Sequence, residues 1–113
     1  MEDSLIELLE TFGVPVYRQG SMSNDEEYPE TFITFWNNES GDHAHYENAE
    51  YGTKWDFDVN VYSSDPEQTY GVLSEIRTLL KKNNWIVPEK GHDVASDEAT
   101  HTGRGLNILY LEI

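Results

Sequence analysis

The chain has 113 residues, enough for one modest core, and we expect residues 1–113 to form a single domain. It carries 22 acidic and 7 basic residues, for a formal net charge of −15 at pH 7. This charge disfavours attraction to nucleic-acid phosphates and to anionic membrane surfaces. The sequence has no cysteine, which excludes disulfides, cysteine-based zinc sites and thiol nucleophiles.

The remaining composition favours a folded protein without a targeting segment. Aromatic residues make up 12% of the chain, and their large side chains make a compact core feasible. The acidic N-terminal stretch lacks the basic region of a secretory signal, and no apolar run is long enough to span a membrane. We therefore expect synthesis in the cytoplasm.

The first element we expect is a helix over residues 4–12. Ser4 and Glu7 have the spacing of a capping box, and Gly13 can adopt the left-handed conformation that ends a helix. The predicted buried stripe consists of four residues: Leu5, Leu8, Leu9 and Phe12.

Three strands are predicted next. Residues 14–17 indicate a short strand, which Pro15 restricts to a sheet edge or a strand start. Residues 31–36, TFITFW, indicate a second strand because β-formers dominate it. The third begins near Ala49 and ends at Tyr62, and we expect it to pair with the second as an antiparallel hairpin.

The third strand alternates strictly between two kinds of residue. Its apolar positions are Trp55, Phe57, Val59 and Val61, and its polar positions are Lys54, Asp56, Asp58 and Asn60. This period of two predicts that one face packs on the core and the other faces solvent.

The second helix begins with clear signals. Asp65 is the expected N-cap, Pro66 occupies the first helical position, and Gln68 completes a capping box. Lys81 and Lys82 suit its negative C-terminal end, and two asparagines then terminate it. Its predicted buried stripe consists of five residues: Val72, Leu73, Ile76, Leu79 and Leu80.

Two further strands complete the pattern. Residues 85–88, WIVP, indicate a fourth strand, and residues 89–103 indicate a polar loop. Residues 103–105, GRG, form a turn that we expect to start the last strand, and residues 106–113 continue it with two apolar faces. The order α-β-β-β-α-β-β predicts an α+β fold with two layers: an antiparallel or mixed sheet of about five strands, with two helices on one face. We expect six residues to be largely buried: Leu9, Phe12, Phe57, Val59, Leu73 and Ile76.

The four histidines were considered as sites of chemistry. His43 and His45 are two residues apart near acidic residues, as metal ligands on a strand can be. His92 lies beside Asp93, and His101 lies in the same polar segment, where a base and its orienting carboxylate would be possible. No nucleophile motif accompanies them, so we expect no catalytic residue, no metal site and no cofactor, and a protein that is not an enzyme. A small metal-binding or hydrolytic domain remains an alternative.

The acidic positions allow several interpretations. Asp56 and Asp58 lie on one face of the third strand, where they line either a solvent-exposed sheet face or the lumen of a ring. The charge also fits an acidic mimic of DNA that inhibits a nucleic-acid-binding protein, which is the first alternative, ahead of the metal-binding or hydrolytic domain.

Four stretches resemble small tail-completion proteins of long-tailed bacteriophages, the tail terminator or minor tail family. They cover most of the chain: LLETFGVPVYRQG (residues 8–20), YPETFITFW (28–36), WDFDVNVYSSDPEQTYGVLSEIRTLL (55–80) and RGLNILYLEI (104–113). The first looks like the family's opening helix with Gly-x-Pro-Val and a short strand, and the third like its strand, acidic cap and long helix. The last resembles its closing strand.

The resemblance implies a structural virion protein at the head–tail interface. Such proteins form a homohexameric ring that caps the tail tube and joins it to the head–tail connector protein, with DNA passing through the lumen. The implied partners are further copies of the chain, the tail tube protein and the connector protein, without specific nucleic-acid binding and without a membrane.

Interface candidates come from the long polar loops and the few basic residues. The loops at Arg18–Pro29 and Asn38–Tyr51 are long for a domain of this size, and aromatic residues are enriched at interfaces. We expect six residues to contact neighbouring subunits or partners: Arg18, Tyr28, Tyr46, Tyr51, Lys54 and Arg104.

Overall fold

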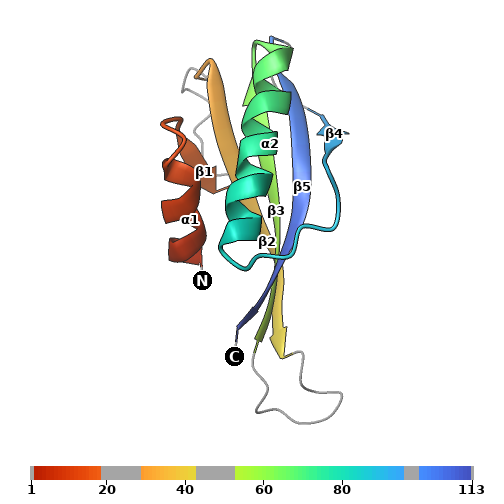
Figure 1. Ribbon diagram of the computed structural model, residues 1–113. Coiled ribbons are helices and arrows are strands. Elements are labelled where there is room, and N and C mark those ends of the chain that lie inside the picture. Colours follow the sequence, from red (N-terminus) through yellow and green to blue (C-terminus); the bar gives the residue numbers. More distant parts are fainter. Residues whose placement is uncertain (1, 19–28, 43–52, 96–99, 113) are drawn as a thin grey trace.

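The protein is a two-layer α+β structure in which two helices cover one face of a five-stranded sheet (Figure 1). The computed structural model describes residues 2–18, 29–42, 53–95 and 100–112. The elements, in chain order, are α1 (Glu2–Glu10), β1 (Val16–Arg18), β2 (Thr31–Asp42), β3 (Thr53–Ser63), α2 (Pro66–Lys82), β4 (His92–Val94) and β5 (Thr102–Glu112). The predicted fold class and the predicted order of helices and strands are confirmed.

The sheet is mixed, with the order β1-β2-β3-β5-β4. β1 runs parallel to β2, whereas β2, β3, β5 and β4 pair antiparallel with their neighbours. β1 forms one edge, as Pro15 predicted, and the carbonyl of Pro15 accepts a hydrogen bond from the Ile33 N–H at 2.8 Å.

β3 lies at the centre of the sheet and pairs along its whole length with β5. Its alternation places Phe57, Val59 and Val61 on the face that packs on the helices, where all three are fully buried. Leu106 and Ile108 of β5 lie beside them, opposite Val59 and Phe57. Of the six residues predicted to be buried, five are, whereas Phe12 is only half-buried because it follows the last turn of α1.

The start of α2 matches the sequence signals in most respects. The Asp65 carboxylate accepts a hydrogen bond from the Glu67 N–H at 3.1 Å, and Pro66 is the first helical residue. The predicted capping box with Gln68 is wrong, because the Asp65 backbone N–H donates to the Ser63 hydroxyl instead, at 3.0 Å. The helix ends where predicted: residue 83 is its C-cap, and residue 84 has a φ of 70°.

The first half of the chain differs from expectation at element ends. α1 begins at Glu2, so Ser4 lies inside the helix and cannot cap it, whereas Gly13 has the expected positive φ of 74°. β2 continues to Asp42, well beyond the predicted end at Trp36, because antiparallel pairing with β3 extends it. The predicted strand start at Ala49 lies outside the described residues.

The second half contains two corrections. Residues 85–88 are not a strand, since Ile86 forms a single bridge with Leu109, and the fourth strand lies instead at His92–Val94, in the predicted loop. At residues 103–105 the expected strand start is confirmed and the turn is not, because β5 begins at Thr102 and includes all three residues. A side chain at Gly103 would collide with the Tyr62 ring, and one at Gly105 with Asn60. The glycines therefore serve close packing inside a strand.

Phe57→Ala tests the centre of the core. Phe57 is fully buried and packs edge-on against Trp85 at a centroid distance of 5.9 Å, so we expect a loss of about 3–5 kcal/mol in the free energy of unfolding. Urea denaturation measures it. Trp36→Ala, at a side chain that is 49% exposed, is the control and should cost less than about 1 kcal/mol. Equal losses for the two variants would contradict the observed packing.

Candidate protein interaction surface

The sheet face opposite the helices carries an exposed surface at one end. Neither described helix covers this end, and its residues come from β2, β3, β5 and the Ile86 bridge (Figure 1). Trp36 is 49% exposed, and Ile86 and Leu111 are each 45% exposed. We call the following set the open face: Trp36, Lys54, Asp56, Asp58, Ile86, Asn107, Leu109 and Leu111.

The other end of the same sheet face is closed by aromatic packing. Phe32 is 3% exposed and stacks on Tyr62 at a centroid distance of 5.3 Å. Tyr17 packs edge-on against Phe32 at 6.1 Å, and the His101 ring lies 5.9 Å from it. Accessible apolar groups on this side of the sheet are therefore concentrated on the open face.

Two carboxylates at the middle of the open face share one amide donor. Asn107 lies opposite Asp58 in the β3–β5 register. Its Nδ2 donates to Asp56 Oδ1 at 2.6 Å and to Asp58 Oδ1 at 3.1 Å. Asp56 and Asp58 point to the same face two residues apart, so their charges repel each other, and the shared amide offsets part of this repulsion.

A β-bulge in β2 brings a second amide to the same carboxylate. The register skips Asn38, which lies between the pairs Asn37–Phe57 and Glu39–Asp56. Asn38 Nδ2 donates to Asp56 Oδ1 at 3.1 Å. Beside the bulge, the side-chain oxygen of Asn37 is buried and has no hydrogen-bond partner among the described residues. Such bulges re-aim side chains, and here the result is a carboxylate held by two amides.

The segment that follows α2 is fastened to β5 by Glu89. The Glu89 carboxylate accepts a hydrogen bond from the backbone N–H of Asn107 at 3.1 Å, where no neighbouring strand supplies a partner. His92 Nδ1 lies 2.7 Å from the same oxygen, and Arg77 Nε donates to the Glu89 carbonyl at 3.0 Å. The position of Ile86 on the open face therefore depends on contacts to α2 and β5.

The predicted site residues do not gather at one place. Asp56, Asp58 and Lys54 lie on the open face, as their alternation predicted, and Arg18 is exposed at the end of β1.

Arg104 lies on the opposite face of the sheet, where it contacts two residues of its own chain. Its guanidinium donates to an Asp93 carboxylate oxygen at 2.8 Å and lies 4.4 Å from the centroid of the Tyr70 ring. Tyr28, Tyr46 and Tyr51 lie outside the described residues.

Two of the four histidines lie in the described residues, and each is close to a polar partner. His43 and His45 lie outside the described residues. His92 pairs with Glu89 rather than with Asp93, because the Asp93 carboxylate is bound by the guanidinium of Arg104. His101 Nε2 lies 2.7 Å from the carbonyl oxygen of Pro29. Across the described ranges, no group of three or more acidic or histidine side chains is placed to hold a metal ion.

No protein-family model matches the chain, and no curated protein is significantly similar to it. In the described part of the chain, neither helix has the length and apolar character that crossing a membrane requires.

Sequence reasoning missed the two asparagines and the exposed apolar residues of this surface. Asn38 and Asn107 carry no motif, because their role depends on the bulge and on the β3–β5 register. Ile86 was predicted to lie in a strand of four residues, and it reaches the open face through one bridge. The signal for Leu109 and Leu111 was present, since the last strand has apolar residues on both faces.

A double-mutant cycle tests the shared amide. Asn107→Ala leaves two neighbouring carboxylates without their common donor, and we expect it to cost about 1–2 kcal/mol of unfolding free energy. In an Asp56→Ala background the same change should cost about 1 kcal/mol less, since one acceptor is already absent. Thr78→Ala, at an exposed position of α2, is the control and should add independently to Asp56→Ala. Additive losses for Asp56 and Asn107 would contradict the network.

Proposed function

We propose that this protein is a structural virion protein, a tail terminator or tail-completion ring at the head–tail interface of a long-tailed bacteriophage. In this role it caps the tail tube and joins it to the connector protein, while DNA passes through the lumen. The resemblance of four stretches supports the proposal, and the observation that carries it is the open face, a surface suited to protein contacts.

The open face has the composition of a protein interface. Three large apolar side chains are about half exposed there, around the amide-bonded carboxylates of Asp56 and Asp58. Aromatic residues are enriched at interfaces, and rigid surfaces with few flexible side chains lose less entropy on binding. Such a face favours a neighbour that offers apolar groups and basic or amide donors.

The lengths of the strands also support assembly. β2, β3 and β5 have 12, 11 and 11 residues, about twice the average strand length of 5–6 residues. Their paired ends extend past both helices, so that three strands project from the body of the domain (Figure 1). A head-to-tail ring needs two different surfaces on each subunit, and the projecting strands expose parts of both sheet faces.

The net charge fits a channel for DNA better than a DNA-binding surface. Carboxylates that face a lumen repel phosphates and prevent adhesion during passage. The same charge opposes ring closure, since every subunit carries −15. Salt screens this repulsion over a distance of about 8 Å at physiological ionic strength. We therefore expect the isolated chain to assemble at higher salt or on the tail tube.

Mass measurement in solution over a salt series, with and without the tail tube protein, tests this function. We expect a monomer at low salt and a closed oligomer, a hexamer by the resemblance, at high salt or with the tube. Trp36→Ser should weaken assembly or tube binding about tenfold, because exposed aromatic residues at interface centres contribute strongly. Tyr70→Ser is the matched control, since Tyr70 is 58% exposed on the helix side.

Two results would reject the terminator role. One is a monomer under every condition without tube binding. The other is tight one-to-one binding to a nuclease or another DNA-binding enzyme, which would favour the acidic DNA mimic.

A further inference from the structure

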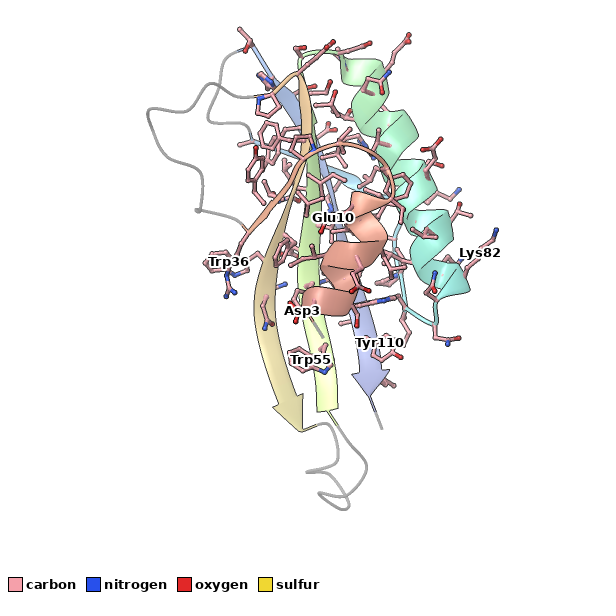
Figure 2. All side chains as sticks on the ribbon, turned by 90° about the vertical axis from the view of Figure 1, so that its left-hand side faces the viewer. Asp3, Glu10, Trp36, Trp55, Lys82 and Tyr110 are labelled. Atoms are coloured by element: carbon pink, nitrogen blue, oxygen red, sulfur yellow. The ribbon has the colours of Figure 1, made fainter. Side chains whose placement is uncertain are left out.

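A cleft on the helix side of the sheet, across the sheet from the open face, has an aromatic wall. It has a volume of about 430 Å³ and lies between α1 and the chain that leaves α2. Trp85 and Tyr110 line it from below α2 and from β5, and Ser4, Glu7 and Thr11 line it from α1 and the turn that follows. Figure 2 shows Tyr110 near the first turn of α1, at the opposite end of that helix from Glu10.

The aromatic wall is held firmly by the core. The backbone N–H of Trp85 donates to the Leu80 carbonyl at 3.0 Å, which closes the end of α2, and the indole is only 5% exposed. The indole packs edge-on against Phe57 at 5.9 Å and lies 5.0 Å from the Tyr110 ring, with an angle of 56° between the two planes. These contacts place two tilted rings at the cleft before any ligand arrives.

The chemistry of the lining selects a cation. Aromatic faces attract ammonium and guanidinium groups, and the half-buried Tyr110 ring offers the face that a cation in this cleft can reach, since Trp85 is only 5% exposed. Glu7 adds the only charged side chain among the described residues of the lining, and the hydroxyls of Ser4 and Thr11 add hydrogen-bond acceptors. Lys82 lines an adjacent groove and not this cleft. The chain already uses this contact once, in the stacking of Arg104 on Tyr70.

We propose that this cleft binds the side chain of an arginine or lysine from a basic partner protein. The net charge of −15 supports a partner other than a second copy, since a basic chain is attracted to this protein whereas an identical chain is repelled. The cleft is of the size that holds small ligands in proteins, so it has room for one long side chain. The proposal does not depend on the terminator role.

Titration with a capped amino acid tests the cleft directly. N-acetyl-argininamide is added to the isotope-labelled full chain, and two-dimensional NMR follows the Trp85 indole and the Tyr110 ring. We expect saturable shifts of both groups, with a dissociation constant of about 1 mM, since one side chain offers few contacts. N-acetyl-norleucinamide, a neutral probe of similar length, should shift neither group.

Two variants that each remove one carboxylate distinguish binding in the cleft from attraction to the overall negative charge. Glu7→Gln should weaken binding of the arginine probe about threefold to fivefold, because it removes the carboxylate of the lining. Glu10→Gln is the matched control, since Glu10 is exposed on the same helix and lines neither groove. Both changes lie at exposed positions, so both proteins should remain folded.

Four other outcomes overturn the proposal. Equal binding of the neutral probe would show a merely apolar cleft, and equal weakening by both variants would show attraction to the overall charge. An absence of shifts at Trp85 and Tyr110 would show that no cation binds there. Self-association that Glu7→Gln abolishes and Glu10→Gln preserves would make a second copy the occupant instead. A chain that binds the probe as expected but never assembles or binds the tail tube would retain the cleft and lose the terminator role.

Discussion

The strict alternation of β3 is the constraint on which the rest of the structure depends. β3 lies between β2 and β5, so each of its residues points either to the helices or to the open face. Phe57, Val59 and Val61 pack in the core with the helices and the apolar side of β5. Asp56 and Asp58 make the opposite side unfavourable for a second helical layer, which would bury their charges. A shift of the register by one residue would bury both carboxylates and expose the three apolar residues, so the pairing admits little variation.

The open face depends on the alternation of β3 and on two asparagine amides that offset the repulsion between its carboxylates. Neighbouring carboxylates on one strand face repel each other, and Asn107 and Asn38 place N–H donors at the point where this repulsion is greatest. The side chains around them are apolar and exposed, as at Trp36 and Leu111. A surface that combines fixed acceptors with apolar contacts has features of the centre and rim of a protein interface.

The helices are shorter in space than the strands they cover, because a helix rises about 1.5 Å per residue and a strand about 3.3 Å. The 9 residues of α1 and the 17 of α2 therefore leave the ends of β2, β3 and β5 without a helix above them. Tyr110 is therefore only half-buried at the edge of the core, where it contacts Trp85 beside α1. Trp36 lies opposite Asp58 and Tyr110 lies opposite Trp55, so the open face and the aromatic cleft are on the two different sides of the sheet (Figure 2). Each has its own expected partner chemistry.

The sequence by itself determined the features that depend on near neighbours in the chain. The Asp65–Pro66 start of α2, the two faces of β3 and the α+β class all follow from local propensity and period. Tertiary structure alone decided the features that depend on register: the extension of β2, the strand at His92–Val94, the place of glycines within β5 and the hydrogen bonds of the carboxylates. Asn107 reaches Asp56 across 51 residues of sequence, and Asn38 reaches it across 18 through a bulge. Such pairs form no local pattern, because the partners meet only when the strands of the sheet align.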